Sequence, residues 1–260
     1  MHNLETFTLE IVGKVGIARM NRPDSLNCFN AKMFEELEGI AKAIEANHDL
    51  QCIVLTGEGK HFSAGIDISL LKEINSEWSL RNVNILHANL HRWENLHQPT
   101  IAAINGACIG GGLAYALCCD IRIAATNASF ALPEVGFGLS PDMGDSQRLP
   151  RIVGASQAKK LILTGERFDA QEAGRLGVVD EVVEPERLME RAMELAEKIA
   201  AQPPMAVRFA KKAINLSMES SLAAGMLFEQ VQSMYSLGSE DKTEAADAFL
   251  EKRKPQFKGR

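Results

Sequence analysis

Two glycine-containing segments have the composition of loops that hold a reacting oxygen with main-chain amides. Residues 61–67 read His-Phe-Ser-Ala-Gly-Ile-Asp and residues 105–112 read Asn-Gly-Ala-Cys-Ile-Gly-Gly-Gly, and each follows a short apolar run typical of a strand. Small residues allow backbone N–H groups to approach a ligand closely. Two such donors converging on one carbonyl oxygen would form an oxyanion hole, which stabilises negative charge as it develops. The pattern predicts an enzyme.

Other functions of these glycines fit the sequence less well. Residues 106–110 have the wrong internal spacing for the Gly-x-Gly-x-x-Gly loop of dinucleotide-binding folds. Residues 57–60, Gly-Glu-Gly-Lys, lack the upstream glycine and the downstream Ser or Thr of a phosphate-binding loop. Both nucleotide-binding motifs are therefore excluded, and tight turns without a chemical role remain as the structural alternative.

The elements that must position these segments alternate between strands and helices. Residues 6–20 alternate around Gly13 and Lys14, which predicts a β-hairpin. Residues 31–46 carry apolar side chains at spacings of three and four, which predicts a helix with one buried face. The same patterns predict strands at residues 52–56, 100–104, 121–125, 130–132 and 178–183, a long helix that ends near residues 98–99, and a helix opened by the triple glycine. The fold class is therefore α/β.

The last quarter of the chain has a different pattern. From Pro185 onward the periodicity is almost wholly helical, with breaks at residues 202–204 and near residues 238–239. We therefore expect residues 1–195 to form an α/β core that carries the oxyanion hole, and residues 196–260 to form a C-terminal helical region.

Composition excludes several classes of protein. The formal net charge of −6 argues against nonspecific attraction to nucleic acid, and no apolar run approaches the roughly 20 residues that span a bilayer. The N-terminus lacks the pattern of a signal peptide, so a cytoplasmic protein is expected.

Five cysteines, an odd number without a Cys-x-x-Cys pair, favour buried thiols over disulfides or zinc. His87 and His91 have metal-ligand spacing, but no third ligand is evident, so no metal is predicted.

The order of several motifs resembles the crotonase superfamily, the enoyl-CoA hydratases and isomerases, nearly from end to end. The motifs are Asn21-Arg22-Pro23, residues 62–67, residues 99–112, Cys119-Asp120-Ile121-Arg122, Gln147-Arg148-Leu149, Leu163-Thr164-Gly165 and residues 249–257. The resemblance implies a spiral of ββα units followed by a C-terminal helical region, assembled as a homotrimer or a dimer of trimers. It implies an acyl-CoA thioester substrate and no metal or redox cofactor, because coenzyme A is part of the substrate.

The resemblance also assigns roles to particular residues. It implies that the N–H groups of Ala64 and Gly111 form the oxyanion hole, and that the neighbouring Gly65, Ile66 and Asp67 contribute to the substrate site. Phe249 and Lys252 correspond to positions that contact coenzyme A from the C-terminal region, often across a subunit boundary. Lys252 lies in a basic cluster at the end of the chain, which is either a solvated tail or a docking site for ligand phosphates.

The acidic residues depart from the hydratase pattern. Of the two hydratase glutamates, the second corresponds to Glu134, but the first falls at Ala114, where a methyl group cannot activate water. A carboxylate is gained at Asp142, where hydratases usually have glycine. Glu134 with Asp142 matches the acid/base pair of dienoyl-CoA isomerases, which normally carry a third acid at the position of Ala114. We therefore expect Asp142 to remove the proton beside the thioester and Glu134 to return one further along the acyl chain, or the reverse.

Structural roles are the alternatives for both acids. Glu134 could pair with a nearby arginine such as Arg148. Asp142 could cap a following helix, although Asp145 and Ser146 are better placed for that task.

Three other functions stay open. The nearest is a hydratase or simple enoyl-CoA isomerase that uses Glu134 alone. An aryl-CoA dehalogenase is more distant. Asp142 and His91 match the pattern of that enzyme, but Glu134 stands where it has a tryptophan. A noncatalytic CoA-binding or RNA-binding relative is disfavoured by the acidic charge and the retained carboxylates.

Overall fold

Two β-sheets form the framework of the computed structural model, which describes residues 4–260. The larger sheet has the strand order β1-β2-β3-β4-β6-β9, with β1 antiparallel to β2 and every other pair parallel. The smaller sheet has the order β5-β7-β8. The strands are β1 (Phe7–Val12), β2 (Val15–Met20), β3 (Cys52–Gly57), β4 (Thr100–Ile104), β5 (Ala107–Ile109), β6 (Ile121–Ala125), β7 (Ser129–Ala131), β8 (Phe168–Asp169) and β9 (Glu181–Val183).

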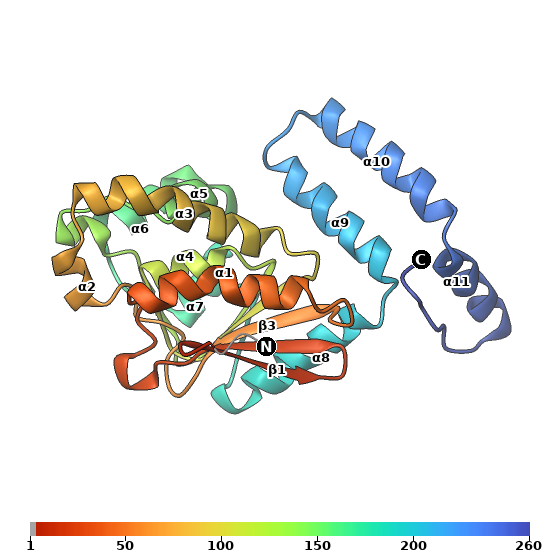
Figure 1. The fold of residues 1–260 in the computed structure, drawn as a ribbon, viewed down its shortest axis with the longest axis horizontal. Helices are drawn as coiled ribbons and strands as arrows, with labels where there is room; N and C mark the ends of the chain where they lie inside the picture. The colour runs from red at the N-terminus through yellow and green to blue at the C-terminus, as the bar shows by residue number, and fades with distance from the viewer. Residues whose placement is uncertain (1–3) are drawn as a thin grey trace.

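Helices cover both faces of the larger sheet (Figure 1). They are α1 (Ala31–Glu45), α2 (Ile68–Glu73), α3 (Ser76–Glu94), α4 (Gly111–Leu117), α5 (Asp145–Val153), α6 (Ala155–Thr164), α7 (Ala170–Leu176), α8 (Leu188–Ala200), α9 (Pro204–Ser217), α10 (Leu222–Leu237) and α11 (Glu240–Glu251). Short 3-10 helices are η1 (Pro23–Ser25), η2 (Glu134–Phe137) and η3 (Pro185–Arg187).

The central strands have continuous apolar sequences because each of their faces packs against a different core. In β4, Ala102 and Ile104 point into the main core, which contains side chains of α1, α3 and α4. Ile101 and Ala103 point to the other face, where α8 packs with Ala192 among its buried side chains. Successive side chains of a strand alternate between faces, so a strand covered on both sides needs apolar residues throughout.

The smaller sheet brings the two glycine-containing segments together. Ser63 forms an isolated parallel bridge with Cys108 in β5. The Ser63 N–H donates to the Ala107 carbonyl oxygen at 2.9 Å, and the Ile109 N–H donates to the Ser63 carbonyl oxygen at 2.9 Å. Residues 46 positions apart in the sequence are thus fixed side by side through main-chain hydrogen bonds, since 109 − 63 = 46.

Most elements predicted from the sequence are confirmed, and the differences lie at their ends. The hairpin turns at Gly13, whose φ of +61° favours glycine. The long helix ends at Glu94 rather than near residues 98–99, and β9 is shorter than the predicted strand at 178–183. The expected boundary between the α/β core and the C-terminal helical region, after residue 195, falls inside α8, which packs on the sheet. The division of the chain into these two units remains a prediction.

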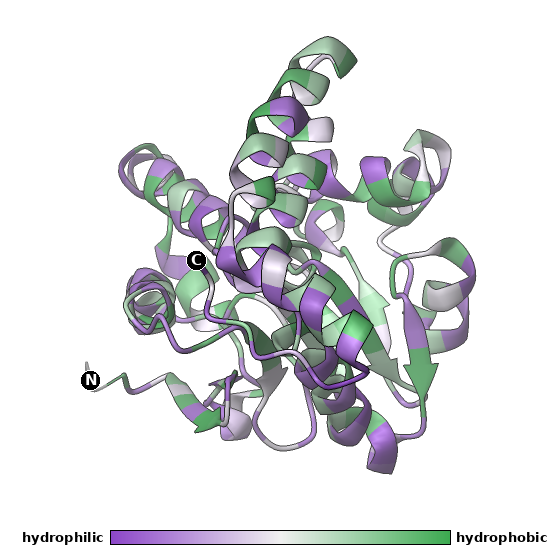
Figure 2. Cartoon of the chain, turned by 90° about the vertical axis from the view of Figure 1, so that its right-hand side faces the viewer, coloured by the Kyte–Doolittle hydropathy of each residue, from purple (hydrophilic) through white to green (hydrophobic). Residues whose placement is uncertain are grey.

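The C-terminal helices are attached to the core by polar contacts from α9. The Lys211 Nζ donates to the Gln98 carbonyl oxygen at 3.0 Å and pairs with Asp120 at 2.8 Å. The Asn215 side chain donates to the Glu94 carbonyl oxygen at 3.3 Å. Beyond this attachment α10 extends away from the sheets (Figure 1). Figure 2, which faces these helices, shows hydrophobic residues along them.

Within residues 4–260, no helix has the length and apolar character that a membrane crossing requires. All five cysteines are free thiols; Cys28 is half-buried and the other four are buried, namely Cys52, Cys108, Cys118 and Cys119.

Candidate active site

The loop that carries Ala64 rests on a tightly hydrogen-bonded turn. Leu26 and Asn27 both adopt left-handed backbone conformations, with φ of 52° and 54°. The Asn27 side chain donates to the carbonyl oxygens of Glu58 and His61 at 2.9 and 2.7 Å. The Ser63 hydroxyl in turn donates to the Asn27 carbonyl oxygen at 2.7 Å. These buried bonds offset the strain of two left-handed residues and fix the position of the loop.

Gly110 and Gly111 at the start of α4 have no side chains, which leaves room for Glu134 and Met143. Gly110 has a φ of +51°, and a Cβ atom there would lie 2.9 Å from the Glu134 Oε1. A Cβ on Gly111 would lie 2.9 Å from the Met143 Sδ. A Cβ on Gly65 would lie 3.5 Å from the Gly111 nitrogen. The Ala64 loop, the start of α4, η2 and the segment before α5 therefore meet at one place.

The two candidate oxyanion donors differ in their hydrogen bonding. The Gly111 N–H, at the N-terminal end of α4, has no acceptor among residues 4–260. The Ala64 N–H donates to the Leu26 carbonyl oxygen at 3.0 Å. Gly111 thus offers a free donor supported by the partial positive charge of a helix N-terminus. Ala64 would have to share its N–H with a substrate oxygen.

The two candidate acids come from η2 and from the segment before α5, and the charge of Asp142 acts on Glu134. Glu134 begins η2 and is half-buried, and its Oε2 has no partner among the described residues. Burial raises the pKa of Glu134, and the charge of Asp142 raises it further. Burial also raises the pKa of the Asp142 carboxyl, although the residue as a whole retains solvent exposure. Two carboxyls whose pKa values move toward neutrality suit proton transfer at cellular pH.

His87 holds the segment that carries Asp142. Its Nε2 lies 2.5 Å from the Asp142 carbonyl oxygen, and because a carbonyl can only accept, that nitrogen carries the proton. The electrostatic effect of His87 lowers the pKa of the Asp142 carboxyl and so opposes the effect of burial. The sequence suggested only a metal-ligand spacing for this histidine.

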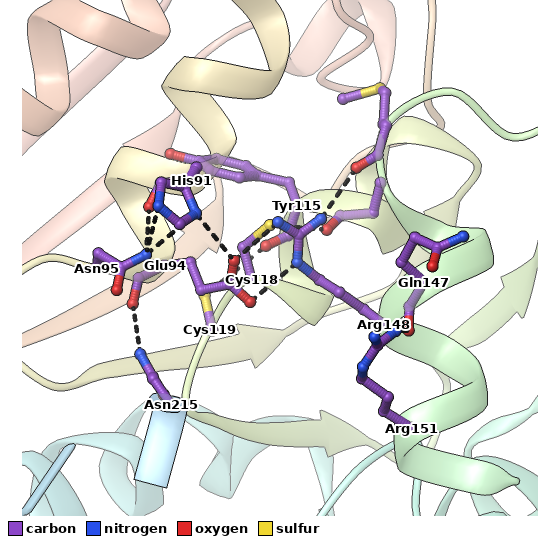
Figure 3. A network of polar contacts seen from close by, with 12 residues as sticks. His91, Glu94, Asn95, Tyr115, Cys118, Cys119, Gln147, Arg148, Arg151 and Asn215 are labelled. Atoms are coloured by element: carbon purple, nitrogen blue, oxygen red, sulfur yellow. Dashed lines mark hydrogen bonds and ion pairs between the residues drawn. The ribbon is translucent and has the colours of Figure 1, made fainter. Parts of the chain in front are cut away.

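The expected alternative of an ion pair between Glu134 and Arg148 is wrong. Arg148 instead makes two parallel bonds to Glu94 of α3, at 3.0 and 2.8 Å, and also donates to the Met143 carbonyl oxygen at 3.2 Å (Figure 3). A guanidinium fork matches a carboxylate in this geometry. The arginine therefore joins α3 to α5 and leaves Glu134 without a cation.

The alternative that an acidic side chain caps α5 is also wrong. The N-cap is Gly144, with a φ of +93° and no side-chain cap. Asp142 lies two residues before it, and Asp145 is the first residue of the helix itself. Asp145 is 2% exposed, and its Oδ1 has no partner among the described residues. Burial and the nearby charge of Glu134 raise the pKa of Asp145 to about 7.

Asp67 and Cys28 complete the surroundings of Ala64. Asp67 caps α2 by accepting from the Ser69 N–H at 3.1 Å and pairs with Arg22 at 3.3 Å. Burial raises the pKa of the Cys28 thiol, while Arg22 and the Ala64 N–H act in the opposite direction. The thiol therefore borders a candidate oxyanion donor, which no sequence motif indicated.

The other predicted contacts with coenzyme A are not assembled in a single chain. Phe249 lies on α11 and is 83% exposed, and Lys252 follows the last residue of that helix. Figure 1 shows α11 at the opposite side of the chain from α2, which begins beside the Ala64 loop. Of the basic cluster, Arg253 pairs with Glu244 at 2.6 Å.

A cavity of about 1060 Å³ lies next to the candidate site but does not include it. Its walls come largely from α3, α5 and α9, and Ala64, Gly111, Glu134 and Asp142 are not among the described residues that line it. Met143 lines the cavity and also lies against Gly111, so its side chain forms a wall between the two spaces.

Comparison with known proteins identifies the family. Residues 10–260 match the family described as enoyl-CoA hydratase/isomerase. The chain belongs to this family. It is 42% identical to a short-chain-enoyl-CoA hydratase of Clostridium acetobutylicum, over 99% of this chain and 99% of the relative. It is 37% identical to a crotonyl-CoA hydratase of Syntrophomonas wolfei, over 97% of this chain and 98% of the relative.

Solved structures show the same relationship. An enoyl-CoA hydratase from Bacillus anthracis superposes with a TM-score of 0.95 at 38% identity, covering 98% of this chain and 100% of that one. The predicted crotonase-like α/β fold is therefore confirmed for this member of the enoyl-CoA hydratase/isomerase family. An acyl-CoA thioester as substrate fits the family.

Proposed function

We propose that this enoyl-CoA hydratase/isomerase family member shifts double bonds within enoyl- or dienoyl-CoA thioesters through an enolate. The observation that carries the proposal is the pair of coupled carboxyls, Glu134 and Asp142, beside the free Gly111 N–H. Ala114, the position of the missing hydratase acid, is 1% exposed and packed within the core. A buried methyl group at that point cannot position water for addition.

The enolate step depends on the main-chain donors. As a carboxylate removes the proton beside the thioester, negative charge grows on the thioester oxygen. The Gly111 N–H would donate to that oxygen without first breaking another hydrogen bond, and the Ala64 N–H would form a three-centre bond shared with the Leu26 carbonyl. Loss of one oxyanion donor costs on the order of 10²–10³ in rate in other enzymes, so this interaction outweighs single pocket contacts.

Different neighbouring charges support separate roles for the two acids. The charge of Asp142 raises the pKa of Glu134, whereas His87 lowers the pKa of Asp142 and so opposes the effect of burial. We therefore assign Asp142 as the base. Glu134, in its protonated form, returns a proton to a carbon further along the acyl chain. No resident cofactor enters this scheme, since coenzyme A belongs to the substrate.

Hydration of an enoyl-CoA is the second candidate. The names of the relatives from Clostridium acetobutylicum and Syntrophomonas wolfei favour it. In that case Glu134 alone would activate water.

The test compares two reactions on one preparation. We expect conversion of a 3,5-dienoyl-CoA to the conjugated 2,4-isomer, followed by absorbance, to be much faster than hydration of crotonyl-CoA. Asp142→Asn and Glu134→Gln should each lower the isomerase rate by roughly 10²–10⁴, the usual contribution of a general acid or base. Asp49→Asn, an exposed acid in the loop before β3, is the matched control.

Four outcomes would reject the proposal. Equal rates for wild type and Asp142→Asn would remove the assigned base. Rapid crotonyl-CoA hydration with negligible isomerisation would favour the hydratase, and halide release from a halobenzoyl-CoA would favour a dehalogenase. Affinity for coenzyme A without turnover on any of these thioesters would indicate a noncatalytic relative.

A further inference from the structure

Asp145 is a third carboxyl at the candidate site, and neither the sequence motifs nor the proposed reaction uses it. It is the first residue of α5 and is 2% exposed, yet it does not cap that helix. Its Oδ1 is buried without a partner among the described residues. A buried polar atom without a partner carries a free-energy cost, so such atoms in folded proteins call for an explanation.

The other unpartnered carboxyl oxygen in this region belongs to Glu134. Its Oε2 is also buried without a partner among residues 4–260, while its Oε1 faces Gly110 at the start of α4. Glu134 lies against Gly110, and Met143, two residues before Asp145, lies against Gly111, so both acids are near the start of α4 and each has one buried oxygen without a partner. The charge of Glu134 is the strongest effect of any neighbouring charge on Asp145.

The remaining charges around Asp145 do not neutralise it. Asp142 raises its pKa and Arg148 lowers it, but Arg148 is engaged in two bonds to Glu94 of α3. Asp145 also acts on the thiols of Cys108 in β5 and of Cys118, the residue after α4, and burial raises the pKa of both thiols, so they stay neutral. Neither carboxyl has a free cation as a partner among residues 4–260, and two such groups shielded from water cannot both ionise at low cost.

We propose that Glu134 and Asp145 share a single proton, with Asp145 as the positioning carboxyl that keeps this proton available to Glu134 at neutral pH. Asp145 does not touch substrate in this arrangement. The shared proton bridges the free oxygens directly or through one water, which would satisfy both of them. The inference rests on the proposed function, in which Glu134 must start each turnover protonated.

The proton balance closes over one turnover. Asp142 takes one proton from the acyl chain, and Glu134 gives one proton to a different carbon of the same chain. That proton is the one shared with Asp145, so both acids of the pair are ionised after the transfer. Asp142 releases its proton to solvent and the pair takes up one proton from solvent, so all three acids return to their starting states.

The first test is the pH dependence of the isomerase rate in Asp145→Asn. The asparagine is nearly isosteric but cannot hold the proton. We expect the alkaline limb of the profile, where the shared proton is lost, to move to lower pH, with the acidic limb set by Asp142 little changed. Glu36→Gln is the control, because Glu36 is a buried carboxyl satisfied by the Glu5 and Thr6 N–H groups in another part of the chain. Its profile should keep both limbs in place.

The second test does not depend on activity. The pKa of Asp145 is about 7 in the folded chain and lies in the ordinary acidic range when unfolded. The folded state therefore binds more protons between these values, and wild-type stability falls as pH rises through that window. Asp145→Asn lacks this loss, so its Tm relative to wild type should rise between about pH 5 and pH 8.

The two tests separate the possible failures. An unchanged alkaline limb in Asp145→Asn, in an enzyme that does isomerise dienoyl-CoA, would overturn the shared proton and leave the proposed function intact. A Tm difference that is the same at both pH values would also overturn it. Absence of isomerase activity in wild type would reject the proposed function, while the Tm difference would still report whether Asp145 holds a proton.

Discussion

At the scale of single residues, the surroundings of each carboxyl, rather than its residue type, set its pKa in the candidate site. Glu134 and Asp142 are both carboxylic acids, but His87 lowers the pKa of Asp142 and has no such effect on Glu134. The Arg148 guanidinium, which could have paired with Glu134, is held by Glu94. Because no cation within residues 4–260 pairs with Glu134, its neutral form is favoured, and one residue type can supply both the acid and the base.

Replacement of His87 tests this separation. His87→Gln removes the imidazole that lowers the pKa of Asp142, so the pKa of Asp142 rises. If Asp142 is the base, the acidic limb of the pH–rate profile moves to higher pH, and activity at acidic pH falls most. His91→Gln, one helical turn away and exposed, is the control. A profile that is identical in His87→Gln and wild type would contradict the role of this histidine.

At the scale of elements, neighbouring segments approach the start of α4 so closely that Gly110 and Gly111 leave no room for larger side chains. Gly110 combines a φ of +51° with the close approach of Glu134, and both features disfavour any larger residue. A helix N-terminus that must present a free N–H to a ligand benefits from this lack of bulk.

Gly110→Ala should therefore displace the Glu134 carboxyl and strain the backbone. We expect a loss of about 1–3 kcal/mol in the free energy of unfolding, and a fall in isomerase rate toward that of Glu134→Gln. Gly136→Ala is the matched control in η2, because a Cβ there meets no atom within 4 Å. Denaturant unfolding and the dienoyl-CoA assay check both values, and a fully active Gly110→Ala would count against the assigned position of Glu134.

The contact between α3 and α5 depends on one arginine. Arg148 and Glu94 have side-chain exposures of 18% and 31%, so their two parallel bonds are partly shielded from water. Arg148→Lys cannot make both bonds, and we expect a loss of about 1–3 kcal/mol in the free energy of unfolding. Arg175→Lys, in an exposed pair with Glu172 on α7, should leave the Tm nearly unchanged. Equal effects of the two substitutions would show that partial burial of the pair is unimportant.

At the scale of the whole molecule, the C-terminal helices expose much more apolar surface than a solitary chain tolerates. The exposed residues on α9 and α10 are Ile214, Leu222, Met226, Leu227, Val231, Met234, Tyr235 and Leu237. Such a continuous apolar surface is typical of an interface between subunits. Self-association would cover this surface and could bring Phe249 and Lys252 of one subunit to the site of another.

Met234→Glu tests this assembly. Met234 is 77% exposed on α10, and a charge at a subunit interface would be costly to bury. We expect wild type to sediment as a trimer or a dimer of trimers and Met234→Glu to shift toward smaller species in analytical ultracentrifugation. Gln230→Glu, at an exposed polar position of the same helix, controls for added charge. A monomeric wild type would contradict the expected oligomer.

The amino-acid sequence by itself determined the alternation of strands and helices, because hydrophobic period and turn residues are local signals. The hairpin at Gly13, the two-faced strands β3 and β4 and the helix after the triple glycine are all predictable in this way. The family resemblance located Ala64, Gly111, Glu134 and Asp142, although their roles remain predictions.

Only the tertiary structure decided which groups are partners. Arg148 follows Glu134 by 14 residues (148 − 134 = 14) but pairs with Glu94, and Asp145 is buried instead of capping its helix. The Leu26 carbonyl occupies the Ala64 N–H for a similar reason, since a remote turn folds against that loop. Partner choice and desolvation depend on distances between segments remote in sequence, and local patterns carry no information about those distances.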